Sequence, residues 1–325
     1  MSSTMWAASG AHGEEMNRAL DIAGAGSALL QTFISRVVQS LTLREHGIQS
    51  GLSRRSGSGN GAYVNRRSPG ATKAEWLTDT DEPSADNGVY TQGFFEFKTM
   101  VTRGKVTRGL RDRGRSYADV LQMELTEKAA DFAEEFETAL AIGDSGVNAN
   151  QINGLITMIN AVSGQVVANT NVDTGDAIDI SRLDETIDKV KGAGRRSDLV
   201  IFASLKGRRL LNASLQASQQ FDEKIEVDAG FRVRSYDDAP IITSTEIPDD
   251  LDYDALSTSI TGYTGGGTTC VIVVNTRYVY IEELNSTTVM PLAKSSSQYD
   301  EFDIFWDGTL VLANPLGAAM LVGVA

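Results

Sequence analysis

The chain of 325 residues is 41% hydrophobic and 22% charged, a balance that allows a sizeable core and excludes wholesale disorder. Its 43 acidic and 29 basic side chains give a net charge of −14, whose mean field repels the phosphates of nucleic acid. One cysteine, Cys270, excludes internal disulfides, and two histidines, His12 and His46, disfavour zinc sites and most histidine-based catalysis.

Residues 1–53 begin with small and polar side chains and then carry apolar residues at helical spacing between positions 29 and 38. The spacing predicts a short amphipathic helix whose apolar stripe, which includes Phe33 and Ile34, needs a partner surface. The sequence SGSGNG at 56–61 is typical of a flexible hinge.

The stretch from residue 60 to residue 110 has the pattern of β structure. It contains GAYVNRR, a Pro69–Gly70 turn, ATKAEWL and an almost unbroken strand pattern from 89 to 110. A two-stranded ribbon is marginally stable alone, so this one must lie against something. A neighbouring subunit is the natural surface for it.

Basic residues gather between positions 54 and 115, whereas acidic residues gather in 119–137, 173–188 and 222–254. The basic segment is either a solvated loop or an arm that docks on acidic surfaces of other copies. The second interpretation is favoured because opposite charges on separate surfaces steer association and fix register. The side chains of this segment that we expect to contact other subunits are Arg54, Arg55, Arg66, Arg67 and Trp76.

Residues 116–142 have the clearest helical pattern in the chain. Ser116 can cap the helix, Asp119 stands three residues later as in a capping box, and Gly143 ends it. A helix of this length would be about 40 Å long and would serve as a structural beam. Its core-facing stripe includes Leu121, Leu125, Phe132 and Phe136.

The remaining chain mixes helices and strands without strict alternation, which indicates an α+β fold. A helix is predicted over 181–192, a buried strand over 198–203, and a second helix that is capped by Ser204. Asp307–Gly308 is expected to form a sharp turn between two strands. Further strands are predicted at 231–235, 240–243, 270–275, 278–282 and within 301–324.

No motif supports catalysis, a cofactor or a metal. The glycine-rich segment 262–270 lacks the spacing of a phosphate-binding loop. Asp250, Asp252 and Asp254 have the spacing of a calcium loop, but the glycine and glutamate that such a loop needs are missing. Cys270 lies in an apolar strand and is expected to be a buried thiol. No apolar run approaches the ~20 residues that span a bilayer, so no membrane association is expected.

The order of these elements resembles the major capsid proteins of tailed phages, which have the Hong Kong 97-type fold. The similarity is carried by AGAGSALLQTFISRVVQSLTLREHGI, by GNGAYVNRRSPGATKAEWLTDTDEP, by Gly154–Leu155 after the long helix, by FRVRSYDDAPIITSTEIP and by the closing FDIFWDGTLVLANPLGAAMLVGV. The resemblance implies four parts. These are an N-terminal arm (1–53), an extended β-hairpin loop (54–98), a peripheral domain (99–155 and 286–308) with a long spine helix over 116–142, and an axial domain (156–285 and 309–325).

The resemblance also implies a function, that of a structural subunit of the virion capsid. Copies would form pentamers and hexamers of an icosahedral shell that confines double-stranded DNA with little specific binding. Portal and scaffolding or cementing proteins would be partners, and assembly would take place in the host cytoplasm. The alternative is an encapsulin shell that stores cargo enzymes, but the long arm and loop disfavour it. An enzyme or a soluble binding module is disfavoured by the missing motif chemistry.

Overall fold

The structure is a computed structural model that describes residues 47–68, 74–83, 87–114, 119–170, 175–192, 196–217, 224–227, 231–251, 267–292 and 298–325. The described residues fall into two compact units, each considered by itself: 105–126 with 298–300, and 47–104 with 127–292 and 301–325. Several predictions concern residues outside the described ones. These are the helix with Phe33 and Ile34, the Pro69–Gly70 turn, the Ser116 cap, Asp252, Asp254 and most of the glycine-rich segment.

The larger unit contains a seven-stranded sheet with the order β5-β13-β10-β6-β9-β8-β7. Its central strands β6, β10 and β13 are predominantly apolar and buried along their whole length, as expected for strands covered on both faces. The strands are β5 (Val166–Ala168), β6 (Leu199–Ala203), β7 (Lys224–Val227), β8 (Phe231–Tyr236), β9 (Ala239–Thr243), β10 (Thr269–Asn275) and β13 (Ala318–Val324).

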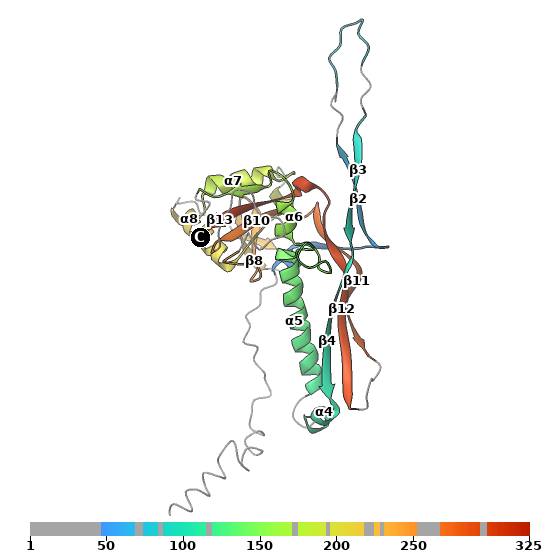
Figure 1. Ribbon diagram of the computed structural model, residues 1–325. Helices are drawn as coiled ribbons and strands as arrows, with labels where there is room; N and C mark the ends of the chain where they lie inside the picture. The colour runs from blue at the N-terminus through green and yellow to red at the C-terminus, as the bar shows by residue number, and fades with distance from the viewer. Residues whose placement is uncertain are drawn as a thin grey trace, which may run out of the picture. The chain divides into compact units, whose positions relative to one another are not determined.

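Two helices, α7 (Ile180–Lys189) and α8 (Leu205–Ala217), pack their apolar residues into one core with alternate residues of this sheet (Figure 1). Ser204 caps α8 as predicted, because its hydroxyl accepts a hydrogen bond from the Gly207 N–H at 3.0 Å. Leu205, the first residue of α8, is exposed.

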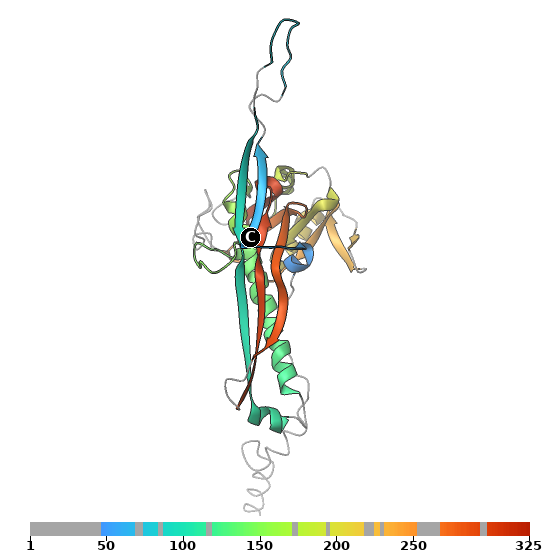
Figure 2. The same ribbon diagram turned by 90° about the vertical axis from the view of Figure 1, so that its right-hand side faces the viewer.

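A four-stranded sheet has the order β1-β11-β12-β4 (Figure 2). Its strands are β1 (Ser53–Ser56), β4 (Lys98–Thr107), β11 (Val279–Pro291) and β12 (Tyr299–Leu312). Alternate residues of β12 are buried, namely Phe302, Ile304 and Trp306. This period of two is typical of a sheet with one covered face.

The expected turn at Asp307–Gly308 is wrong, because both residues lie inside β12. Gly308 pairs with Glu283 of β11, and the register shifts immediately beyond this pair. A Cβ atom at Gly308 would lie 2.5 Å from the Trp306 ring and 2.6 Å from the Glu282 carbonyl oxygen. Glycine at this position allows the strand backbone to pack closely where the pairing is irregular. The Asp-Gly dipeptide therefore does not mark a hairpin turn here.

The remaining two-stranded sheet is the ribbon of β2 (Gly61–Ser68) and β3 (Val89–Glu96), paired from Gly61↔Glu96 to Ser68↔Val89. Residues 74–77, the described part of ATKAEWL, do not form a strand. The strand that pairs with β2 is β3, which begins after residue 88. The strand pattern predicted over 89–110 breaks at Phe97 and ends at Thr107. Thr107 begins the short helix α4 (Arg108–Gly114) by accepting the Leu110 N–H.

The long helix α5 spans Val120–Ile142, four residues less than predicted at its start. Asp119 caps it, since its carboxylate accepts the Gln122 N–H at 3.2 Å. Gly143 ends the helix as predicted. Four further short helical segments are described: α3 (Gly47–Gly51), α6 (Leu155–Asn160) and the 3-10 turns Arg196–Asp198 and Pro315–Gly317.

Candidate assembly interface

The two arginines of β1 are held by contacts within the chain. Arg54 donates to the Glu283 carboxylate at 2.7 Å, and the Trp306 indole N–H donates to the same oxygen at 2.9 Å. The Arg55 guanidinium lies 3.7 Å from the centre of the Tyr280 ring. Burial raises the pKa of Glu282, and the nearby charge of Arg55 only partly opposes that shift.

Arg66 fastens the ribbon to the end of β12. Its guanidinium donates from Nε to the Ala313 carbonyl at 2.8 Å and from Nη2 to the Leu312 carbonyl at 2.7 Å. The same face of the ribbon buries Ala62 in a small cluster with Tyr280 and Val311. Arg66 therefore holds the ribbon in place, and its charge is already engaged by two carbonyl groups.

The opposite face of the ribbon is exposed and made of cross-strand pairs. The rings of Tyr63 and Phe94 lie 4.8 Å apart, and the Gln92 amide donates to Asn65 Oδ1 at 3.1 Å. Arg67 lies over the Tyr90 ring at 5.9 Å. Exposed tyrosine, phenylalanine and arginine side chains fixed by their neighbours are the residue types that carry most binding energy in protein interfaces. We call this surface, formed by Tyr63, Asn65, Arg67, Tyr90, Gln92 and Phe94, the ribbon face.

Beyond the ribbon, residues 74–83 present Trp76 fully exposed. Asp81 closes a turn immediately after it, accepting hydrogen bonds from the Thr78 hydroxyl at 2.5 Å and the Thr78 N–H at 3.2 Å. These hydrogen bonds lower the pKa of Asp81. Trp76 thus stands next to a hydrogen-bonded turn, and a fully exposed tryptophan is a candidate anchor for a partner.

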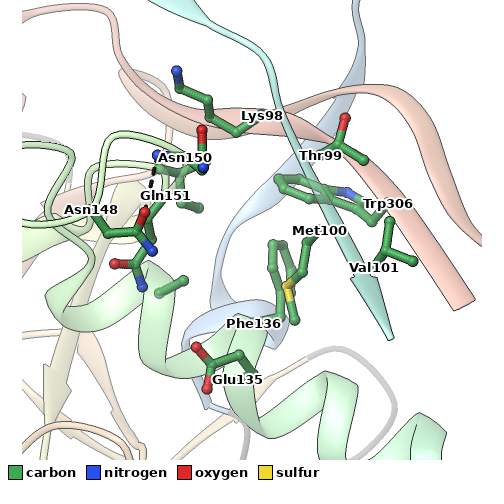
Figure 3. A pocket seen from close by; sticks show the side chains of 12 residues that line it. Lys98, Thr99, Met100, Val101, Glu135, Phe136, Asn148, Asn150, Gln151 and Trp306 are labelled. Carbon is green, nitrogen blue, oxygen red and sulfur yellow. Dashed lines mark hydrogen bonds between the residues drawn. The ribbon is translucent and has the colours of Figure 1, made fainter. Parts of the chain in front are cut away.

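Of the predicted core residues of α5, Phe132 and Phe136 are buried, whereas Leu121 and Leu125 are only half-buried. The Phe136 ring lies 4.5 Å from the Trp306 ring. These two rings form the floor of a pocket of about 260 Å³ between α5, β4 and the loop after α5 (Figure 3). Its polar rim is formed by Lys98, Glu135, Asn148, Asn150 and Gln151.

Sequence reasoning missed Glu137, Glu283 and Trp306, which join separate elements through their side chains. Glu137 had a signal: it lies three residues before Leu140 and next to Phe136, on the apolar side of the helix, where a carboxylate is unexpected. Trp306 alternates with the buried Phe302 and Ile304, so period-two burial could have placed it. Nothing local marks Glu283, because its partner Arg54 is far away in the sequence.

Cys270 is fully buried in β10, and burial raises the pKa of its thiol to about 12. Because the thiolate is the reactive form, we expect no reaction with a thiol reagent at pH 8 while the subunit is folded, and complete reaction in denaturant. Colorimetric thiol titration with and without guanidinium measures both. Stoichiometric labelling of the native subunit would contradict this burial.

None of the described helices is long and apolar enough to cross a membrane. Similar solved structures share the fold at low sequence identity. The holo-SrpI encapsulin complex of Synechococcus elongatus matches with a TM-score of 0.65 and 12% identity over 91% of this chain and 95% of its own. The capsid of a native GTA particle matches with a TM-score of 0.60 and 14% identity over 95% of this chain and 99% of its own. The Cyanophage A-1(L) capsid matches with a TM-score of 0.63 and 12% identity over 89% of this chain and 96% of its own.

These likenesses show the fold: the chain has the Hong Kong 97-type fold. No curated protein matches the sequence. The profile of the SU10 major capsid protein family, however, matches residues 73–325, and the chain belongs to this family. Its role is therefore structural, that of a major capsid protein, and the family resemblance inferred from the sequence is confirmed.

Proposed function

We propose that copies of this chain assemble as pentamers and hexamers into an icosahedral shell that encloses double-stranded DNA. The observation that carries this proposal is the ribbon face, an ordered and exposed surface of aromatic and basic side chains on a chain of net charge −14. An exposed surface of this kind is expected to bind a protein partner. In a shell made of one kind of chain, that partner is another copy of the chain.

The exposed side of α5 is a suitable acceptor in the neighbouring copy. It carries the exposed Asp131 and Glu135, with the half-buried Glu127 one turn before them, whereas the buried side carries Phe132 and Phe136. A basic and aromatic ribbon face and an acidic helix are complementary in charge, which favours one docking register over others. The contacts predicted for Arg67 and Trp76 with a second copy rest on this complementarity.

We also propose the division into an arm (1–53), an extended loop (54–98), a peripheral domain (99–155 and 286–308) and an axial domain (156–285 and 309–325). The ribbon of β2 and β3 supports the second part, since it lies within 54–98. The seven-stranded sheet supports the last part, since all of its strands lie within the proposed axial segments.

Portal and scaffolding or cementing proteins would be further partners, and assembly would take place in the host cytoplasm. No catalytic activity is proposed. Cryo-electron microscopy of purified particles tests the proposal, with closed icosahedral shells and layered internal DNA density as the expected result. Shells filled with folded cargo proteins would instead favour the encapsulin alternative, and a chain that stays monomeric at every concentration would contradict shell formation.

The packaged DNA is expected to be confined and not bound. A subunit of charge −14 repels duplex DNA, so the unassembled subunit should show no measurable binding at 150 mM salt. Arg18, Arg36 and Arg44 of the N-terminal segment are the candidate exceptions; three such contacts would give a salt slope of about −3. Fluorescence anisotropy with a labelled duplex measures this. Submicromolar affinity would point to a genome-organising role.

A further inference from the structure

Glu137 of α5 is a fully buried carboxylate that joins three separate elements. Its Oε1 accepts the Ile48 N–H at 2.6 Å and the Ser244 hydroxyl at 2.8 Å, and its Oε2 accepts the Gln49 N–H at 3.0 Å. Two of the three donors are therefore backbone groups of α3, the helix that follows the N-terminal segment (blue in Figure 2).

The negative charge of Glu137 matters in this arrangement. None of the ion pairs found among the described residues involves Glu137, so the hydrogen bonds alone compensate the buried charge. Because both oxygens accept from donors, a glutamine at this position would turn an NH₂ group towards a donor. A neutral side chain of the same shape thus leaves at least one N–H or O–H unpaired in the interior.

The other contacts of α3 fix its position but do not replace Glu137. The Gln49 side chain donates to the Ala133 carbonyl of α5 at 2.8 Å. A Cβ atom at Gly47 would lie 2.0 Å from the Thr243 carbonyl oxygen, so the backbone of α3 lies directly against β9. A Cβ atom at Gly51 would lie 2.6 Å from the Phe202 ring. The chain leaves α3 in one direction into β1 and in the other into residues 1–46.

We propose that Glu137 is a positioning residue for assembly: its charge holds α3 on the long helix and so sets the point from which residues 1–46 leave the subunit. Without these hydrogen bonds α3 is no longer held in one position on α5. The N-terminal segment then starts from a point that is not fixed, and it cannot reach a neighbouring subunit in one defined direction. The assembly part of this inference rests on the proposed function, whereas the anchoring part concerns the single subunit.

Glu137→Gln in the full chain tests the anchor, with hydrogen exchange of the unassembled subunit followed by mass spectrometry. We expect the peptide that contains Ile48 and Gln49 to exchange about tenfold faster or more, the effect of losing a charge-assisted hydrogen bond. Trypsin should also cleave faster after Arg44, while exchange in β6 and β10 stays at the wild-type rate. Asp188→Asn, which removes an exposed charge on α7, is the matched control and should change neither.

Shell yield is the second measurement. Folded Glu137→Gln subunits should give few closed shells, and Glu137→Asp, which keeps the charge with a shorter reach, should restore part of the yield. Unchanged exchange at Ile48 and Gln49 in Glu137→Gln would overturn the anchor, whatever the subunit assembles into. Faster exchange with a normal shell yield would overturn the role in assembly. If Glu137→Gln does not fold, Glu137→Asp is followed by the same exchange measurement: its side chain is one methylene too short to reach both N–H groups of α3, so exchange faster than wild type is expected there, and a wild-type rate would show that these hydrogen bonds do not hold α3.

Discussion

Phe136→Ala is expected to destabilise the subunit by about 3–5 kcal/mol, the range for removing a buried aromatic side chain. The Phe136 ring is 2% exposed and packs 4.5 Å from the Trp306 ring, and the Arg54 guanidinium lies 5.7 Å from its centre. The substitution would leave a cavity between α5 and β12 that these neighbours cannot fill without moving. Urea denaturation of the unassembled subunit, followed by tryptophan fluorescence, measures the loss.

Phe132→Ala belongs to the same range, because Phe132 is also buried. Leu125→Ala on the same helix is the control. Its side chain is only half-buried, so it should cost less than half as much as Phe136→Ala. Equal losses for Leu125→Ala and Phe136→Ala would show that the burial of this helix differs from the structure described.

Arg67→Glu is expected to abolish shell assembly while the subunit keeps its fold. Arg67 lies on the ribbon face, where it contacts only the Tyr90 ring among the contacts described, so the reversed charge would meet the proposed acidic partner. Like charges at an interface cost several kcal/mol, enough to remove shells at micromolar subunit concentration. Size-exclusion chromatography and negative-stain microscopy measure shell yield, and circular dichroism checks the fold.

Changing Arg66 and Arg67 together would not isolate docking from ribbon stability, because the two residues make different contacts. Arg66 donates two hydrogen bonds to carbonyl groups at the end of β12, so Arg66→Glu would loosen the ribbon within its own subunit. Arg54→Glu is a useful second comparison, because it breaks the contact with Glu283 inside the subunit. If Arg67→Glu assembles at the wild-type yield, the ribbon face is not a docking surface.

The elements that could be predicted are those specified by residues close together in the sequence. The stripe with Phe132 and Phe136, the continuous apolar run of β6 and the Ser204 cap each follow from neighbours in the sequence. The errors arose where a long-range contact overrides a local signal. Asp307–Gly308 has the composition of a turn, yet Gly308 is needed for the approach to Glu282 in the middle of a strand.

The amino-acid composition predicted which segment forms the candidate interface, but it did not predict which side chains of that segment are exposed. Charge clustering identified the arginine-rich segment, but it could not tell Arg66, which holds the ribbon, from Arg67, which lies on its exposed face. That difference follows from the alternation of β2 and from the position of Ala313, more than two hundred residues away in the sequence. The buried Glu137 was missed for the same reason, since its donors belong to α3 and to the residue after β9.

The position of β13 has a consequence for the order of folding during synthesis. This strand lies between β5 and β10, and among the strands that the structure describes β5 pairs with β13 alone. Val166 of β5 pairs with Met320 of β13, which the ribosome adds about 150 residues later. At typical elongation rates this separation corresponds to a delay of about 8–30 s. The seven-stranded sheet is complete only when residues 318–324 have emerged from the ribosome, so a nascent chain that still lacks them cannot present the finished sheet to its neighbours.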